Sequence, residues 1–414
     1  MDSLDPVPSA AAPQTPALTR ATIVVAVSVF LNFTGFTLIL PVIPFLVVRY
    51  VPQEQVGLYV GLIVSVFALC AFCAAPVLGA LSDRYGRRPI LMLSLLGSAV
   101  GYVIFGLGGA LWILFLGRVV DGLTAGNVST MYAYVADTTA PAERGRVYGM
   151  LGAVGGLGFM LGPVAGGMLG AITPNAPLFA AAALTLGNIL WVYLALPESV
   201  PPAVTRQEWR WQKLNPLTQL SRVLGIAALR TPFAAAFSFF FAGAMLQSNF
   251  AVYLKDVLQF GPTGIGWVLF TVGVMDIVSQ GLFTRALLRR VGADVLARSG
   301  LFVNAVGFAL IACLVFLPRL EFLLPSIVIF TLGDGLFQPA ISGIIANAAP
   351  ADAQGLVQGA NQAQQALGRM LGPLLAAVMS PLAAGAPYWT GALIALAGVV
   401  VLSASTRRVA SEAG

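Results

Sequence analysis

The sequence lacks histidine and is poor in cysteine and in charge, and each shortage excludes a class of protein. Only 9% of its 414 residues are charged, whereas soluble domains carry about 25%. So few charges exclude an ordinary cytosolic enzyme, a nucleic-acid-binding protein and a disordered chain. Without histidine there is no imidazole chemistry and no His-ligated metal site. Cys70, Cys73 and Cys313 lie in apolar runs and predict helix packing rather than a disulfide framework or a metal site.

Long apolar runs dominate what is present, and they predict an all-α membrane protein. A membrane-spanning helix needs about 20 apolar residues, and 58% of the chain is hydrophobic. Short polar clusters break the apolar runs eleven times, which predicts twelve spans in two bundles of six. We expect a disordered cytoplasmic tail, an N-terminal bundle, a cytoplasmic linker, a C-terminal bundle and a second tail at residues 1–20, 21–198, 199–230, 231–406 and 407–414.

Lysine and arginine predict the orientation of the spans. Three of these residues, Arg49, Lys255 and Arg319, lie in the loops after odd-numbered spans, whereas seventeen lie in the other loops and the tails. Both termini are therefore predicted to be cytoplasmic. The net charge of +6 then reflects this topology and contact with anionic lipid, not nucleic acid. Within the linker, three leucines on one helical face predict a short interfacial helix: Leu217, Leu220 and Leu224.

A repeated sequence relates the two halves. GFMLGP at Gly158–Pro163 recurs as GRMLGP at Gly368–Pro373, at an offset of 210 residues, and two further pairs of glycines share that offset. Two six-helix halves of like orientation are typical of major facilitator transporters. The repeat therefore predicts that fold.

The loop after the second span reads GALSDRYGRRPIL and resembles the loop signature of the major facilitator superfamily. The matching residues are Gly79, Asp83, Arg84, Gly86, Arg87 and Arg88. We expect this loop to act as a gate latch. Gly79 would allow close helix approach, and Asp83 would face the positive end of another helix. Arg87 would pair with Asp137 at the end of span 4, and such pairs would hold one gate closed and break on opening. The alternative is a basic loop that only obeys the charge rule.

Span 5 contains GFMLGPVAGG, which resembles a signature found mostly in exporting branches of the superfamily. Its candidate residues are Gly158, Gly162, Pro163, Gly166 and Gly167. The glycines would let helices pack closely, and the proline would kink the helix. Generic packing of small residues is the alternative.

Five charged residues are predicted to lie well inside the spans, where charge is costly and by default functional. They are Arg118 and Asp121 in span 4, Asp276 in span 8, Asp334 in span 10 and Arg369 in span 11. Arg118 and Asp121 are three residues apart, so they share a helical face and can pair. Asp334 can pair with Arg369. Because the chain has no histidine, proton coupling would use the carboxylates; purely structural ion pairs are the alternative.

Aromatic and amide side chains inside the spans predict a cavity for flat, amphipathic molecules. The candidate binding residues are Asn32, Phe36, Gln247, Asn249, Trp267, Asn361 and Gln365. Most phenylalanines in the spans must face lipid, so packing is the alternative for any single one. Amides in a span are more informative, because each needs a partner.

The likeness to known transporters extends along nearly the whole chain. Span 1 reads FLNFTGFTLILPVIP, span 4 and its exit read LGRVVDGLTAG and AYVADTT, and the second half contains LNPL and QGLVQG. These segments resemble the drug:proton antiporter branch of the superfamily, and within it the tetracycline efflux proteins. The resemblance implies exchange of a drug for a proton, in tetracycline's case with a bound divalent cation.

The chain departs from that group at the membrane acids. The group has aspartates in spans 1, 3 and 9 and a histidine in span 8, where this chain has Asn32, Gly101, Asn304 and Asp276. Asp121 and Asp334 are acids where the group is usually uncharged. The comparison implies a proton path that has moved to spans 4, 8 and 10. It also puts tetracycline, and a metal–drug chelate, in doubt as substrates.

We therefore predict a twelve-helix, proton-coupled exporter of small amphipathic molecules, above all lipophilic cations. It would be a monomer in the bacterial inner membrane, without cofactor or metal, and would bind substrate at mid-membrane between its halves. A metabolite exporter or facilitator, or a lipid flippase, is the first alternative; a membrane sensor without transport is the second. An enzyme is not predicted, since no nucleophile–base set, metal-ligand cluster or phosphate-binding Gly–Lys loop occurs.

Overall fold

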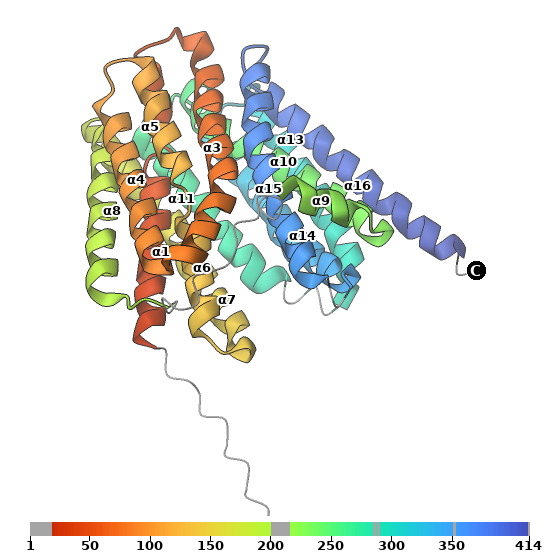
Figure 1. Cartoon of the computed structure of the whole chain (residues 1–414). Helices are drawn as coiled ribbons and strands as arrows, with labels where there is room; N and C mark the ends of the chain where they lie inside the picture. The colour runs from red at the N-terminus through yellow and green to blue at the C-terminus, as the bar shows by residue number, and fades with distance from the viewer. Residues whose placement is uncertain (1–18, 200–215, 285–286, 288–289, 351–352, 413–414) are drawn as a thin grey trace, which may run out of the picture.

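The computed structural model describes residues 19–199, 216–284, 287, 290–350 and 353–412, and these form helices without a strand. The predicted all-α architecture is confirmed. The predicted N-terminal tail and most of the linker, residues 1–18 and 200–215, lie outside the described residues. The predicted C-terminal tail does not begin at residue 407, because the last helix continues to Glu412 and projects from the bundle (Figure 1).

The first half contains eight α-helices that form six spans. They are α1 (Arg20–Leu38), α2 (Ile43–Val47), α3 (Val56–Tyr85), α4 (Arg87–Leu107), α5 (Leu111–Leu123), α6 (Asn127–Thr138), α7 (Pro141–Ile172) and α8 (Ala176–Ala195), with a 3-10 turn, η1 (Gln53–Gln55), before α3. Span 4 is divided between α5 and α6. The Thr124 hydroxyl bonds back to the carbonyls of Val120 (2.9 Å) and Asp121 (3.1 Å) at the break. Such side-chain bonds offer the backbone an alternative to the helical ladder.

The second half follows the same plan. Its elements are α9 (Pro216–Leu224), α10 (Ala227–Val257), α11 (Pro262–Val278), the π-helical turn η4 (Ser279–Thr284), α13 (Ala293–Cys313), α14 (Leu320–Ala348), α15 (Gln354–Met379) and α16 (Ala386–Glu412). The helix predicted in the linker is α9, but its buried face differs from the prediction. Val223 is fully buried in the core, whereas Leu224 is 40% exposed. The linker is also shorter than predicted, because α10 begins at Ala227.

Eleven helices among the described residues are long and apolar enough to cross a membrane, one fewer than predicted. The remaining position belongs to α15, which has 26 residues. It carries Asn361, Gln364, Gln365 and Arg369, so it is less apolar than the other spans. It nevertheless packs as a span, between α3, α10 and α16 (Figure 1). Its polarity points to contact with something other than lipid.

The repeated GxMLGP segments make equivalent contacts inside the two halves. A Cβ atom on Gly162 of α7 would lie 2.8 Å from the Thr34 carbonyl oxygen of α1. One on Gly372 of α15 would lie 2.7 Å from the Phe241 carbonyl oxygen of α10. Only glycine allows such close approach of two helices. The internal repeat read from the sequence is therefore a structural repeat.

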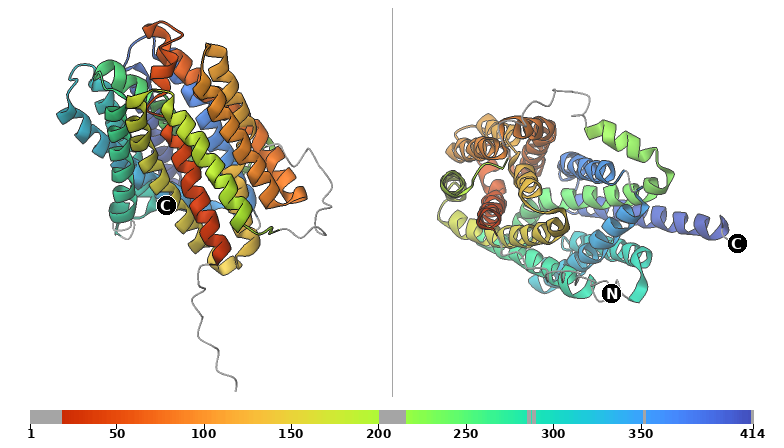
Figure 2. Two further views of the ribbon diagram at one scale, coloured as in Figure 1. Left: turned by 90° about the vertical axis from the view of Figure 1, so that its left-hand side faces the viewer. Right: turned by 60° about the horizontal axis from the view of Figure 1, so that its bottom comes forward.

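The same two segments also join the halves. The carbonyl oxygen of Pro163 on α7 lies against Gly266 on α11, and that of Pro373 on α15 lies against Gly61 on α3. The interface thus consists of two equivalent helix pairs, α7 with α11 and α15 with α3. Figure 2 shows the α7–α11 contact from two further directions. Each repeat supplies one helix that contacts both its own bundle and the other.

We call the end of the molecule with Arg49, Lys255 and Arg319 the arginine-poor end; there the halves are closed against each other. Gln53 Nε2 donates to Asp256 (2.6 Å), and Lys255 Nζ donates to Gln53 (3.1 Å). The Thr263 hydroxyl donates to a carbonyl of α7 (3.2 Å). Within the described part of the chain, these three side-chain hydrogen bonds join the halves, and all lie at this end.

The opposite, arginine-rich end differs. Several glycines of α3, α7, η4 and α14 lie near this end, and a Cβ atom placed on any of them would meet no atom within 4 Å: Gly79, Gly145, Gly149, Gly281 and Gly343. These faces of the helices therefore have no close neighbour there. Among the described residues, side-chain hydrogen bonds join the halves at the arginine-poor end and not at the arginine-rich end.

Candidate transport site and gate

Arg118 and Asp121 form the ion pair that their spacing predicts. Arg118 Nη1 lies 3.2 Å from Asp121 Oδ2, and the residues are 3% and 2% exposed. The guanidinium is surrounded by aromatic rings, with the Phe105 centroid at 4.7 Å and that of Tyr102 at 5.7 Å. This pair therefore lies inside the first bundle, among α3, α4 and α5. Its position is that of a fixed structural charge, because cation–π contact and burial both hold the arginine.

Asp276 and Asp334 lie together in the second half. Gln280 Nε2 donates to both carboxylate oxygens of Asp276 at 2.9 Å, and Asn304 Nδ2 donates to Asp334 Oδ1 at 2.8 Å. The two carboxyl groups are near enough to interact electrostatically. The π-helical turn of η4 lies directly after Asp276, and such turns occur often at functional sites. The structure thus brings together the acids of α11 and α14 and the amide of α13.

The predicted Asp334–Arg369 pair is not formed. Asp334 instead accepts its hydrogen bond from Asn304. Arg369 is solvent-exposed, and in the part of the chain that the structure describes it makes no ion pair. The reason lies in packing: α14 packs on α13 and η4. Meanwhile the α15 glycines, Gly368 and Gly372, face α10.

A second repeat became visible only in the structure. Asp121 and Asp334 each begin the tripeptide Asp-Gly-Leu. Gly122 packs on α3 against the Phe67 carbonyl, and Gly335 packs on η4 against Ser279, so the two acids occupy equivalent places. They differ in their partners, since Asp121 has an arginine and Asp334 has an amide. The shared tripeptide, which recurs after 213 residues, is the sequence signal that could have predicted this equivalence.

The predicted latch contact between Arg87 and Asp137 is present. Arg87 Nε lies 2.7 Å from Asp137 Oδ2, and Arg87 also pairs with Asp83 through Nη1. Asp83 was predicted to face the end of a helix, and this prediction is wrong, because Asp83 faces an arginine instead. The close helix approach expected at Gly79 is also absent in this state. Arg84 lies over the ring of Tyr85 at 5.3 Å.

The carboxylate that caps a helix here belongs to Glu198, which sequence reasoning missed. It accepts the backbone N–H groups of Arg87 (2.8 Å) and Arg88 (3.1 Å) at the start of α4. A carboxylate there satisfies free donors and faces the positive end of the helix dipole. Gly86 precedes the helix with φ of 100°, and a Cβ atom on it would lie 2.6 Å from Glu198 Oε2. Glycine at this position therefore has a local cause.

The span-5 residues pack as expected. Gly158, Gly162 and Gly166 lie against backbone or side-chain atoms of α1. A Cβ atom placed on Gly167 would lie 2.5 Å from the Pro262 carbonyl oxygen of α11. Pro163 lies within the unbroken helix α7. The motif therefore holds α7 between the two halves, which explains the glycines by contact and not by flexibility.

The candidate substrate residues lie on α1, α10, α11 and α15. Gln247 and Trp267 are exposed, whereas Asn32 and Gln365 are half-buried. Phe36 packs on Phe67, with 5.8 Å between the ring centroids. Asn249 is buried and its Oδ1 has no hydrogen-bond partner, whereas Asn361 Oδ1 accepts a hydrogen bond from Gln364 (2.8 Å). The amides of α15 thus partner each other in part. Substrate binding by these residues stays a prediction.

Comparison with known proteins agrees with this architecture. The profile of the Major Facilitator Superfamily matches residues 25–373 and 233–412. The class C tetracycline resistance protein of Escherichia coli is 34% identical over 375 residues, which cover 90% of this chain and 92% of that protein. The class G protein of Vibrio anguillarum is 32% identical, over 89% and 92%. The human organic anion transporter MFSD10 (TETRAN) has 25% identity and a TM-score of 0.69, over 94% of this chain and all of that one.

The fold and these relatives define a multi-pass membrane transporter rather than an enzyme. The chain belongs to the major facilitator superfamily. Within it, the chain is a drug:proton antiporter that is similar to the tetracycline resistance proteins. Among the described residues, no group of three or more potential metal ligands occurs.

Proposed function

We propose that this antiporter couples drug export to a proton carried by Asp334, with Asp276 as its neighbour. The observation that carries the proposal is the lack of a cation beside these acids. In the described part of the chain both have amide donors and no ion-pair partner. A charge in the membrane interior is costly without compensation. Asp334 therefore needs either a proton or a cationic substrate whenever water is excluded, so the two compete for it.

Asp121 takes a different role in this proposal. Its charge is already compensated by Arg118 in the interior of the first bundle. An ion pair of this kind stays charged through the cycle, because removing one charge would leave the other buried and unpaired. Asp121 and Arg118 therefore keep the first half rigid, and the equivalent position in the second half, Asp334, exchanges the proton.

The charge rule assigns the arginine-rich end to the cytoplasm. The structure then represents the state open to the cytoplasm, in which substrate enters between the halves. The cycle proceeds by rocking of the halves about the α7–α11 and α3–α15 contacts. Substrate leaves on the other side when Asp334 takes a proton from outside. Arg87 is paired with Asp83 and Asp137 in this state, and all three residues belong to the first half, so in this proposal they organise its cytoplasmic end and do not latch the halves together.

Lipophilic cations are the proposed substrates. Two uncompensated acids make the interior of the second half attractive to a positive charge, and the exposed Trp267 lies edge-on to Phe270 (5.5 Å between centroids), where aromatic faces attract cations. The tetracycline resistance relatives extend the proposal to that drug. Their membrane aspartates, by the resemblance described above, are replaced here, which favours a substrate without bound metal.

The proposal is tested with inside-out membrane vesicles that hold a proton gradient, read by a pH-sensitive dye. Ethidium, tetraphenylphosphonium, tetracycline and simple metabolites are added one at a time. A lipophilic cation should collapse the gradient with the wild type and not with Asp334→Asn. Glu143→Gln, which removes an exposed acid outside the bundle interior, serves as the matched control and should behave as wild type. Collapse by a metabolite alone, or full activity of Asp334→Asn, would contradict the proposal.

A further inference from the structure

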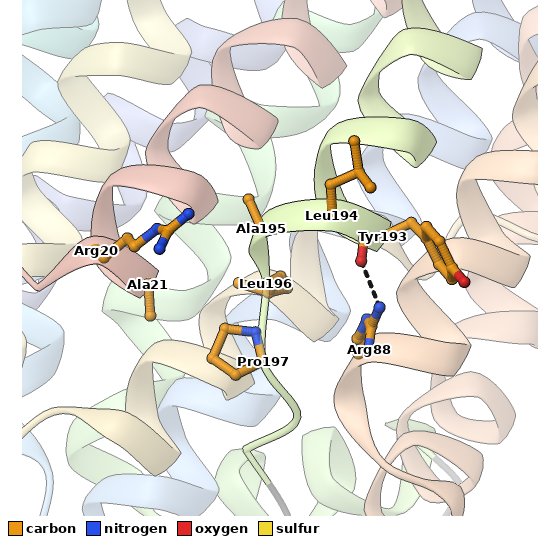
Figure 3. A pocket seen from close by; sticks show the side chains of 8 residues that line it. All are labelled: Arg20, Ala21, Arg88, Tyr193, Leu194, Ala195, Leu196 and Pro197. Carbon is orange, nitrogen blue, oxygen red and sulfur yellow. Dashed lines mark hydrogen bonds between the residues drawn. The ribbon is translucent and has the colours of Figure 1, made fainter.

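A pocket of about 380 Å³ lies at the arginine-rich end of the first half (Figure 3). The start of α1 contributes Arg20 and Ala21, the start of α4 contributes Arg88, and the end of α8 contributes residues 193–197. The pocket is separate from α3, α7, α11 and α15, the helices that join the halves. It therefore has no part in the transport path described above.

Two guanidinium groups flank the pocket, and no acid lines it. Arg88 Nη2 donates to the Tyr193 carbonyl (2.5 Å) and its guanidinium lies over the Tyr193 ring at 5.2 Å, which fixes its direction. Its Nε is buried without a hydrogen-bond partner. Arg20 makes no ion pair within the described residues. The Glu198 carboxylate, next to the lining residue Pro197, accepts the first N–H groups of α4. Among the described residues, neither Arg20 nor Arg88 has a carboxylate as ion-pair partner.

An apolar strip leads away from the pocket along α8. Leu186, Leu190 and Leu194 are spaced by four residues, so they lie on one helical face. They are 50%, 57% and 70% exposed. Since α8 is long and apolar enough to cross a membrane, this face contacts lipid. Tyr193, 57% exposed beside the pocket, is an aromatic residue at the level where tyrosine is enriched, the membrane–water interface.

We infer that this pocket binds one anionic phospholipid of the leaflet at the arginine-rich end. Its phosphate lies between Arg20 and Arg88, and its acyl chains lie along the leucine strip of α8. Arginine suits this role because its planar group gives two parallel hydrogen bonds to phosphate oxygens. The lipid is anionic rather than zwitterionic because the two arginines would repel a choline or ethanolamine cation, and Arg88 already lies over the one aromatic ring of the lining, that of Tyr193. A bound lipid would hold the starts of α1 and α4 together.

The test is native mass spectrometry of the full-length protein, stripped of lipid in detergent and titrated with dioleoylphosphatidylglycerol. Arg20→Gln should weaken the tightest lipid site about fivefold, the effect of one basic residue at a membrane surface. Arg298→Gln is the matched control, since it removes the same charge at the same end, on α13 outside the pocket, and should leave that site unchanged. Leu194→Gln, on the exposed strip, should also weaken it.

Two further titrations identify the source of the phosphate. Dioleoylphosphatidylcholine, with the same chains, should bind more weakly than phosphatidylglycerol because its choline is repelled by the arginines, and Arg20→Gln should reduce the difference between the two lipids. Glycerol 3-phosphate, which has no chains, should not displace the lipid. The inference is overturned if Arg20→Gln and Arg298→Gln lose affinity equally, if phosphatidylcholine binds as tightly, or if the chainless phosphate competes.

Discussion

At the scale of single residues, the two equivalent acids show how partners decide function. Asp121 and Asp334 start the same tripeptide in the two halves, and in each half the glycine that follows the acid packs closely on a neighbouring helix. Arg118 compensates the first, and Asn304 only hydrogen-bonds the second. A compensated charge is part of the architecture, whereas an uncompensated one must be neutralised by something that comes and goes. On this contrast rests our proposal that one half has the structural acid and the other the coupling acid.

The ion pair gives a stability prediction. Arg118→Met should lower the free energy of unfolding by about 3–5 kcal/mol, because it leaves the Asp121 carboxylate buried without a partner. Thermal unfolding of the purified protein in detergent measures the change. The double variant Arg118→Met/Asp121→Leu should regain most of the stability, since it buries no charge. A single variant as stable as wild type would show that the pair is not needed.

The same double variant also bears on mechanism. If Asp121 is structural, the double variant should still move protons against substrate in vesicles at a rate close to that of wild type. Complete loss of coupling in a stable double variant would place the proton on Asp121 instead.

At the scale of elements, the start of α4 depends on a contact between distant segments. Glu198, after α8, accepts the first two free N–H groups of α4. Glu198→Gln should cost about 1 kcal/mol, the usual worth of a cap and of a charge at a helix end. Gly86→Ala should cost more, because its φ of 100° strains any side chain and the new Cβ would overlap Glu198. Thermal unfolding compares both with Gly145→Ala, where a Cβ meets no atom.

The elements also show what sequence reasoning could and could not reach. The Arg118–Asp121 pair follows from spacing on one helix, and the Arg87–Asp137 contact follows from a resemblance to a known loop. The rotation of α14 against α13 depends on packing of many side chains, so the partner of Asp334 could not be predicted. The Glu198 cap joins residues 111 apart, and no local pattern records it.

At the scale of the whole molecule, small-residue contacts differ between the two ends. Gly61 on α3 touches the Pro373 carbonyl at the closed interface, whereas Gly79, on the same helix, faces open space at the other end. A large side chain at either place should therefore bias the two states in opposite directions. We expect the twelve spans to move as two rigid halves, and these glycines to permit the halves to tilt relative to each other.

That bias can be measured. Gly61→Leu should favour opening at the arginine-poor end, because the closed contact has no room for the side chain. Gly79→Leu should keep the arginine-rich end open, because it obstructs the approach that closes it. Spin-label distances between the halves, measured at each end, should change in opposite directions for the two variants. Unchanged distances in both would mean that these glycines do not set the state.

The central claim is that proton and substrate compete at Asp334, and proton release tests it most directly. Ethidium is added to the purified protein in weakly buffered detergent, and the change in pH is recorded across a range of starting pH. Wild type should release protons as the cation binds. Asp334→Asn should bind ethidium without release, while Glu143→Gln matches wild type. Proton release that persists undiminished in Asp334→Asn would contradict the account and move the coupling site elsewhere.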